Sequence, residues 1–171
     1  MRRNENPTPT ALAGRRRASR AQDEHIVDPY RQARKLSEPS YCGQCGAVYR
    51  AGRWKWGPQP EGAQEVLCQA CRRINDKYPA GVVTLTGSSA LTHGEEITHL
   101  VRHQEESEKQ EHPLNRIINI EQTADGLVIN TTDIHLPARI GKAVQRAFRG
   151  ELKEHFDESG YFARVKWHRD D

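Results

Sequence analysis

Long apolar runs are missing from this chain of 171 residues. Hydrophobic residues make up 35% of it, the mean hydropathy is -0.88, and no stretch approaches the roughly 18 apolar residues that a membrane helix needs. The N-terminus contains arginines but no apolar segment of the kind found in secretory signals. We therefore expect a soluble protein of the cytoplasm with no membrane partner. An arginine-rich transit peptide in residues 1–21 is the competing interpretation.

Motifs of several enzyme classes are also missing. The chain has no glycine-rich phosphate loop, no nucleophile elbow and no pair of carboxylates with a reason to be coupled. His99 and His103 lie four residues apart in a predicted helix and could share a metal ion, but no glutamate follows His99 as in zinc proteases. We therefore expect a protein that is not an enzyme. A metal-dependent enzyme that uses His99 and His103 is kept as a second alternative.

Cysteine is scarce, and its four copies form two close pairs. The spacing is Cys42-x2-Cys45, then 22 residues, then Cys68-x2-Cys71. Two tight turns can together place four thiolates at about 2.3 Å around one Zn2+ ion, which closes the tetrahedron and leaves no catalytic position. Disulfides would need an oxidising compartment, and a redox pair would not need a second copy. The pattern predicts one structural zinc ion, with iron at the same ligands as the alternative.

The segment between the two cysteine pairs predicts a β-hairpin over residues 47–56, with its turn at Ala51-Gly52. Residues 39–78 then form a zinc ribbon whose core is the metal, because so short a segment buries too little apolar surface to fold alone. The hairpin mixes rings that can stack on unpaired bases with cations that can hold phosphates, which is typical of RNA contacts. These residues are Arg50, Arg53, Trp54, Lys55 and Trp56. Alternatively, the two tryptophans cover the cysteine turns.

The first segment, residues 1–38, predicts a disordered basic arm, because it has too few large apolar side chains to offset the entropy of ordering. It includes a basic cluster at residues 14–20 that could bind nucleic acid electrostatically or simply aid solubility.

Residues 79–171 predict a β-α-β-β-α-β-β module. Strands are expected over 80–87, 116–123, 127–132, 151–156 and 161–168, and helices over 93–112 and 133–150, where Asp133 can cap the second helix. The first six elements match the split βαβ, ferredoxin-like pattern, in which two helices cover one face of an antiparallel sheet. The fold class is therefore α+β, with an extra C-terminal strand.

Cations gather on one side of two of these elements. On the second helix, the predicted buried side is Leu136, Ile140, Val144, Ala147 and Phe148, and the opposite stripe is Arg139, Lys142, Arg146 and Arg149. On the last strand, Tyr161, Ala163, Val165 and Trp167 alternate with Phe162, Arg164, Lys166 and His168. Both cationic sets predict phosphate contacts, with an ordinary solvated surface as the alternative.

The segments YCGQCG, LCQACRR, YPAGVVTLTG and HPLNRIINIEQTADGLVINTTDIHLPARIGKAVQRAFRGEL resemble a group of small bacterial zinc-ribbon proteins. That group is similar in turn to the amino-terminal part of the archaeal and eukaryotic adaptor that binds the large ribosomal subunit and serves in its nuclear export. The resemblance covers residues 40–169. It implies ribbon chemistry at the four cysteines and ribosomal RNA as a partner, although the adaptor carries more than one ribbon and this chain supports a single zinc site.

These features together predict a non-enzymatic zinc-ribbon protein that binds RNA and associates with the ribosome, in large-subunit assembly, translation or quality control. Ribosomal RNA and ribosomal proteins are the expected partners. The first alternative is a zinc ribbon that docks on proteins, such as a transcription-associated factor, through its hairpin and its acidic first helix.

Overall fold

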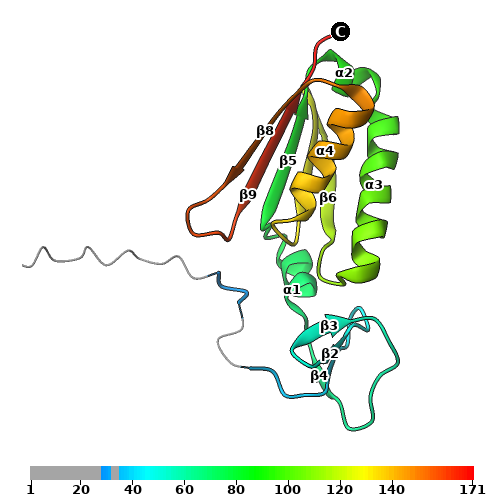
Figure 1. Ribbon diagram of the computed structural model, residues 1–171, viewed down its shortest axis with the longest axis vertical. Coiled ribbons are helices and arrows are strands. Elements are labelled where there is room, and N and C mark those ends of the chain that lie inside the picture. The colour runs from blue at the N-terminus through cyan, green and yellow to red at the C-terminus, as the bar shows by residue number, and fades with distance from the viewer. Residues whose placement is uncertain (1–27, 32–34) are drawn as a thin grey trace, which may run out of the picture.

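The computed structural model describes residues 28–31 and 35–171. They form two units that meet near α1 (Figure 1). The cysteine unit, residues 39–78, contains β1 (Ser40–Cys42), β2 (Val48–Arg50), β3 (Arg53–Lys55), β4 (Gln64–Val66) and α1 (Gln69–Asp76). The α/β unit, residues 79–171, contains β5 (Gly81–Thr86), α2 (Ser88–Thr92), α3 (Gly94–Glu111), β6 (Ile117–Thr123), β7 (Gly126–Thr131), α4 (Leu136–Phe148), β8 (Glu151–Phe156) and β9 (Ala163–His168). The protein is thus α+β, with two mixed sheets and four helices in the described part.

Part of the segment predicted to be a disordered arm, residues 1–38, contacts the cysteine unit. The Asp28 carboxylate accepts a hydrogen bond of 2.6 Å from the guanidinium of Arg73, which also lies 4.3 Å from the centroid of the Tyr30 ring. Arg73 is only 4% exposed, so Asp28 supplies the counter-charge that a buried guanidinium requires. The basic cluster predicted at residues 14–20 lies outside the described residues.

The hairpin predicted between the cysteine pairs is present as β2 and β3. Ala51 and Gly52 form its turn with φ angles of 53° and 74°, the left-handed values that a two-residue hairpin turn requires. The Glu38 carboxylate accepts from both of their N–H groups, at 2.8 and 3.1 Å, and so satisfies the donors of the turn. The complete sheet has the order β3-β2-β1-β4, with β4 parallel to β1.

The second cysteine pair lies on a helix that the sequence analysis did not predict. Cys68 is the N-cap of α1, and its sulfur accepts from the Cys71 N–H group at 3.4 Å, in the way that a serine hydroxyl caps a helix. The helix ends at Lys77, which has left-handed backbone angles. The zinc-ribbon prediction is therefore not confirmed as a fold, because only the first pair lies in a turn between strands.

The large sheet has the order β6-β7-β5-β9-β8. β7 lies between β5 and β6 and is antiparallel to both, which is the split βαβ arrangement predicted for the first part of the module. In the ferredoxin-like pattern, the strand that follows the second helix would lie beside β5. Here β8 lies at the edge of the sheet, and β9 takes the place beside β5, parallel to it.

The burial of the two last strands explains this difference. The inward residues of β9, which are Ala163, Val165 and Trp167, are almost completely buried, whereas β8 is exposed at every position except Leu152. A strand with a continuous apolar face is more stable in the middle of a sheet, and a polar strand is better tolerated at an edge. The ferredoxin-like prediction is therefore not confirmed.

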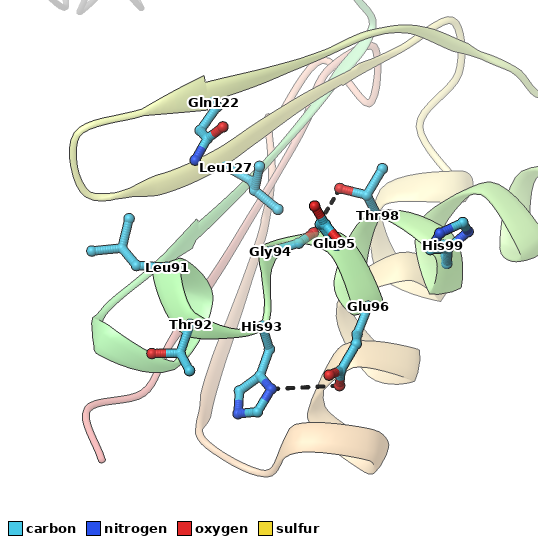
Figure 2. Close-up of a pocket in the computed structure, with 10 residues that line it drawn as sticks. All are labelled: Leu91, Thr92, His93, Gly94, Glu95, Glu96, Thr98, His99, Gln122 and Leu127. Atoms are coloured by element: carbon cyan, nitrogen blue, oxygen red, sulfur yellow. Dashed lines mark hydrogen bonds and ion pairs between the residues drawn. The ribbon is translucent and has the colours of Figure 1, made fainter.

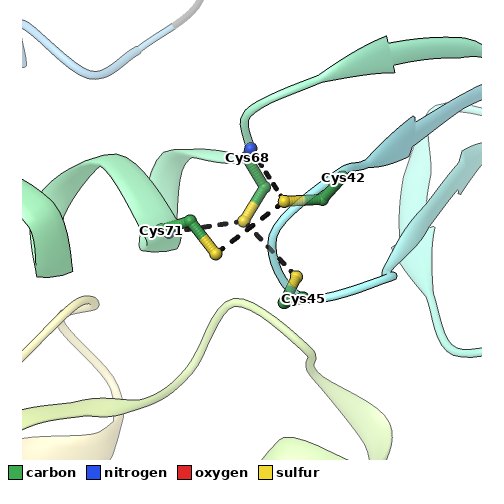
Figure 3. Close-up of side chains that lie close together, drawn as sticks. All are labelled: Cys42, Cys45, Cys68 and Cys71. Atoms are coloured by element: carbon green, nitrogen blue, oxygen red, sulfur yellow. Dashed lines mark hydrogen bonds between the residues drawn. The ribbon is translucent and has the colours of Figure 1, made fainter.

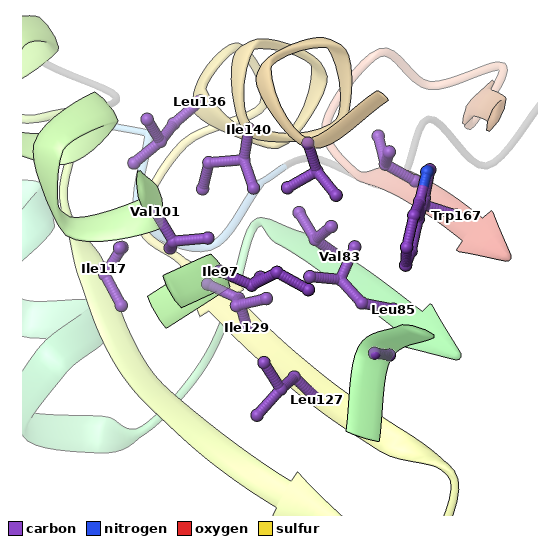
Figure 4. Close-up of a cluster of buried hydrophobic side chains, with 13 residues drawn as sticks. Val83, Leu85, Ile97, Val101, Ile117, Leu127, Ile129, Leu136, Ile140 and Trp167 are labelled. Atoms are coloured by element: carbon purple, nitrogen blue, oxygen red, sulfur yellow. The ribbon is translucent and has the colours of Figure 1, made fainter. Parts of the chain in front are cut away.

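Helices α3 and α4 cover one face of the large sheet, and the core lies between the two layers (Figures 1 and 4). The largest buried side chains come from every layer and include Val83, Leu85, Ile97, Val101, Ile129, Ile140 and Trp167. The Asp133 carboxylate caps α4, as predicted, by accepting from the N–H groups of His135 and Leu136 at 2.7 and 3.0 Å. In the described part of the chain, no helix combines the length and the apolar composition needed to cross a bilayer.

The predicted buried side of α4 is correct at Leu136, Ile140 and Val144 and wrong at Ala147, which is exposed. Ala147 has nearly the same angular position on the helix as Ile140. It lies in the last turn, however, where the core has ended and only Phe148 still packs against it.

Gly141 is the point of closest approach between α4 and the sheet. A Cβ atom at this position would lie 2.6 Å from Val165 Cγ1 and 2.8 Å from Leu152 Cδ1. Helix propensity alone predicts that Gly141→Ala stabilises the protein by about 1 kcal/mol. Because the core would be overpacked, we expect the opposite, a loss of about 1–3 kcal/mol in the free energy of unfolding, measured by denaturant titration. Gly94→Ala, at a helical glycine with open space around it, is the control that should not destabilise the protein.

Candidate metal centre

The four cysteines converge from three elements of the cysteine unit (Figure 3). Cys42 ends β1, Cys45 lies in the turn that follows, and Cys68 and Cys71 belong to the first turn of α1. β1 pairs with β4, the strand that leads into α1, and this pairing brings the two cysteine turns together. The sequence spacing thus correctly predicted which residues meet.

The distances between the sulfur atoms fit a tetrahedral metal site. Cys42 Sγ lies 3.8 Å from Cys71 Sγ, Cys45 Sγ lies 3.8 Å from Cys68 Sγ, and all four ligand atoms are within 4.8 Å of one another. A tetrahedron with metal–sulfur bonds of about 2.3 Å has sulfur–sulfur edges of about 3.8 Å. All four thiols are free, since a disulfide would need a sulfur–sulfur distance of about 2.0 Å. The cluster could therefore hold one metal ion.

Backbone donors make part of this cluster electropositive. The Cys68 N–H group points at Cys42 Sγ at 3.4 Å, and the N-terminus of α1 faces the sulfurs. Burial alone would raise the pKa of the Cys42 thiol, but backbone N–H groups of Cys68, Cys45 and Gln44 outweigh it and lower this pKa to about 6. One ligand is therefore ready to bind as a thiolate near neutral pH.

Two other ligands resist ionisation when no metal is bound. Burial raises the pKa of the Cys68 thiol strongly, and the charges of the neighbouring cysteines add to the rise. Burial is also the main cause of the raised pKa of Cys45. A metal ion must therefore displace protons from these thiols.

Metal affinity is expected to fall as the pH falls. Protons compete with the metal below the pKa of each ligand, and the raised pKa values of Cys45 and Cys68 keep this competition active through the neutral range. Between about pH 8 and 6, the apparent affinity should drop by at least tenfold per unit of pH, if one or more protons are released on binding. Competition titrations with a chromophoric chelator at several pH values measure the slope. A pH-independent affinity would contradict this expectation.

A cation from the α/β unit completes the surroundings of the cluster. The Nη2 atom of Arg116 lies 3.2 Å from Cys71 Sγ and 3.4 Å from Cys68 Sγ, within hydrogen-bonding distance of both. Burial would lower the pKa of Arg116, but the hydrogen bond to Cys71 and the charges of the cysteines raise it instead. Leu114 also packs against the cluster. Arg116 was not among the predicted site residues. It lies 45 residues from Cys71 in the chain, and no local sequence pattern links the two positions.

No family model, curated protein or solved structure matches this chain.

The hairpin residues predicted to bind nucleic acid divide into two groups. Trp54 packs against the cysteine cluster and against the Tyr49 ring, with 5.4 Å between ring centroids, so it covers the metal site. Trp56 is 40% exposed, and its Nε1 donates to the Lys109 carbonyl oxygen on α3 at 2.6 Å, so it joins the two units. The cations Arg50, Arg53 and Lys55 are exposed, as the prediction requires.

The four cations predicted on the second helix are exposed, but Arg149 lies just past the end of α4, and acids from other elements neutralise part of the stripe. Arg139 forms an ion pair of 2.8 Å with Glu108 on α3, and Lys142 lies 3.7 Å from Glu154 on β8. The helix sequence alone, which places no acid in the stripe, could not reveal these partners. Together with Arg146, these two cations line a hollow of about 370 Å3 beside Gln104 of α3.

The uncovered face of the large sheet carries three cations and a histidine, and two of the cations have acidic partners: Lys153 pairs with Glu151 at 3.0 Å and Arg164 with Asp157 at 2.5 Å. Arg164 and Lys166 project from β9 on this face, as predicted, and the pairing with β8 places Lys153 opposite Lys166 and His155 opposite Arg164. We call these four residues the open-face cluster. Arg164 also lies 4.4 Å from the centroid of the Phe162 ring. Beside the cluster is a hollow of about 460 Å3, whose lining includes Thr84, Thr86, Lys153, Lys166 and His168.

The histidine pair predicted as an alternative metal site has no third ligand in the described part of the chain. His99 and His103 are both exposed on α3, and the four cysteines are the one group of three or more candidate ligands that the described residues bring together. His99 lines a hollow of about 540 Å3 at the start of α3, where His93 instead pairs with Glu96 at 3.4 Å (Figure 2). The geometry therefore lends no support to a metalloenzyme site at this place.

Proposed function

We propose that this chain is a non-enzymatic, zinc-containing RNA-binding protein of the cytoplasm that associates with the ribosome. The zinc is structural, because four cysteine ligands fill its tetrahedral coordination and leave no position for a substrate. In this proposal, the cysteine unit is a zinc ribbon in a variant form, in which the first turn of α1 supplies the second ligand pair.

The observation that carries the RNA proposal is the open-face cluster. Like charges placed directly opposite each other on neighbouring strands are destabilising, yet Lys153 faces Lys166 across the β8–β9 pair. Glu151 offsets part of this repulsion through its ion pair of 3.0 Å with Lys153, and a phosphate lying between the two lysines would offset the rest. The Phe162 ring offers a stacking surface for a base, and the hydroxyls of Thr84 and Thr86 can hydrogen-bond with RNA. This combination suits single-stranded RNA better than a duplex.

The other predicted cations take secondary places in this proposal. The stripe on α4 and the open-face cluster lie on opposite sides of the α/β unit, so one short RNA segment cannot contact both. Acids partly neutralise both groups. Glu108 and Glu154 lie beside the α4 stripe, and Glu151 and Asp157 pair with Lys153 and Arg164 on the open face. The exposed hairpin cations Arg50, Arg53 and Lys55 remain available for further phosphate contacts. Ribosomal RNA, with ribosomal proteins beside it, is proposed as the partner on the resemblance described above.

Replacing three cations of the open-face cluster tests the proposal. We expect Lys153→Ala, Arg164→Ala and Lys166→Ala together to weaken binding of a labelled single-stranded RNA by at least about tenfold. The slope of log affinity against log salt should also fall by about 2, since each phosphate contact on a single strand contributes about 0.7. Fluorescence anisotropy measures both quantities. The free energy of unfolding should change by less than about 1 kcal/mol, because the substitutions remove a like-charge pair together with two exposed ion pairs, to Glu151 and Asp157, of small and opposite effect.

The matched control removes three cations from the other side of the unit, as Lys142→Ala, Arg146→Ala and Arg149→Ala. It changes the net charge equally and should affect RNA binding less. An equal loss in both triple variants would indicate only non-specific attraction, and unchanged binding in both would reject the RNA proposal. Association with ribosomes is tested separately by sedimentation of cell lysates.

A protein-docking function is the second candidate, and the acidic surface of α3 favours it. Glu95, Glu96, Glu106 and Glu111 are all exposed on this helix. A partner held by protein contacts would be recovered with the tagged protein after nuclease treatment, whereas partners held through RNA would be lost.

A further inference from the structure

The metal centre is enclosed by both units, because Arg116 reaches it from the α/β unit. Arg116 directly precedes β6, and its backbone is held on both sides by one buried residue. Its N–H group donates to Thr132 Oγ1 at 2.9 Å, and its carbonyl oxygen accepts from the Thr132 N–H group at 2.9 Å. The guanidinium is thus presented to Cys68 and Cys71 from a fixed point of the sheet.

The charge of Arg116 matches what this centre lacks. Four thiolates around a divalent ion carry a net charge of about 2−, and three of the four cysteines are 1% exposed or less. A buried charge of this size is costly unless cations or N–H donors compensate it. Among the described side chains, Arg116 is the one cation that hydrogen-bonds to a cysteine sulfur. Its own Nε atom is buried without a partner, so the two sulfurs are its main acceptors.

We propose that Arg116 is a positioning residue of the metal centre and couples metal binding to the placement of the α/β unit. The proposal rests on the metal centre and not on RNA binding. An ordered tetrahedron of sulfurs holds the guanidinium, and with it the start of β6 and the adjoining Thr132. When the metal leaves, the sulfurs lose this order and Arg116 loses both acceptors. The other contacts between the units are small. They include one hydrogen bond from the half-exposed Trp56 to Lys109 and the packing of Leu114 against the cysteine cluster.

The first test uses Co2+ alone as a spectroscopic probe of the sulfurs. In Arg116→Met, which keeps the length of the side chain and removes its charge and N–H groups, we expect the sulfur-to-cobalt charge-transfer band to move to longer wavelength. Loss of zinc to a chelator should become about 10–100 times faster. Arg72→Met removes an equal charge next to Cys71 but no described hydrogen bond to sulfur, and it should stay within about twofold of the unchanged protein.

The second test separates coupling from simple stabilisation of the metal. In the unchanged protein, adding Zn2+ should slow hydrogen exchange in the cysteine unit and also at the amides of Arg116 and Thr132 in the α/β unit. In Arg116→Met, saturating Zn2+ should protect the cysteine unit only. Arg116→Lys, which keeps the charge without the forked donor, should fall between the two and also serves if Arg116→Met fails to fold.

Three results would overturn the proposal. The first is a spectrum and a release rate in both Arg116 variants equal to those of the unchanged protein. The second is an Arg72→Met variant that is as impaired as Arg116→Met, which would indicate a general charge effect. The third is an unchanged protein that binds no metal. No RNA is present in these measurements, so they still test the role of Arg116 if the RNA proposal is wrong.

Discussion

Chelation of the metal is expected to unfold the cysteine unit and to leave the α/β unit folded. The cysteine unit has almost no apolar core of its own, since its buried cluster consists of Cys42, Cys68, Ala70 and Cys71 with a few partly buried neighbours. Structural zinc contributes about 10–16 kcal/mol of binding free energy in small zinc modules, which far exceeds what this cluster can supply. The α/β unit instead has a continuous core between α3, α4 and the large sheet.

Hydrogen exchange read by mass spectrometry measures this difference. After addition of a strong chelator, peptides from residues 40–76 should exchange completely within seconds, while peptides that contain Val83, Ile129 and Val144 keep their protection. Cys71→Ser should reproduce the effect without a chelator, because three thiolates and a hydroxyl bind zinc poorly. Ala70→Ser places the same hydroxyl at the neighbouring buried position and should retain the metal. Persistent protection of the cysteine unit without metal would contradict the expectation.

Truncation of Trp167 is expected to have the largest effect on the α/β unit. Trp167 is completely buried on β9, opposite Leu152 of β8 and Leu85 of β5, and its Nε1 donates to the Arg149 carbonyl oxygen. Trp167→Ala leaves a large cavity, so the free energy of unfolding should fall by about 3–5 kcal/mol. For a chain of this size, the midpoint of thermal unfolding should fall by about 10 °C or more.

Trp167→Phe is the matched control, because it keeps most of the apolar ring and loses the indole N–H group. We expect a smaller loss of about 1–2 kcal/mol, due to the unpaired Arg149 carbonyl and the smaller ring. Both variants should retain the metal, since Trp167 lies in the other unit. If Trp167→Ala were as stable as the unchanged protein, β9 could not lie inside the sheet between β5 and β8. The prediction therefore also tests the strand order.

Local patterns in the sequence were sufficient for most of the secondary structure. The turn at Ala51-Gly52 and the helix that begins after Asp133 lie where the sequence patterns predicted them. The turn between β6 and β7 is formed by Ala124 and Asp125, because Gly126 already pairs with Thr123. In each case the responsible contacts join residues a few positions apart. Helix α1 was missed, because its N-cap is a cysteine, a residue that the usual capping rules do not include.

The candidate metal centre was predictable as a set of ligands but not as an environment. The spacing of the four cysteines identifies them, because two short turns must each present two sulfurs. The contact of Arg116 with Cys68 and Cys71, and the role of Trp56 in joining the units, depend on how the two units pack. Glu108 beside Arg139 is a similar case, because a helix sequence cannot show which charges a neighbouring helix will bring.

The sequence by itself determined the elements, their capping residues and the four cysteines, because periodicity, turn chemistry and ligand spacing act over a few residues. Only the tertiary structure decided that β9, and not β8, lies beside β5, that Lys153 faces Lys166, and that Arg116 reaches the sulfurs. These outcomes depend on which pairing of distant segments buries the most apolar surface and leaves the fewest charges without a partner. Both quantities depend on contacts between residues that are far apart in the chain, so a short stretch of sequence cannot predict them.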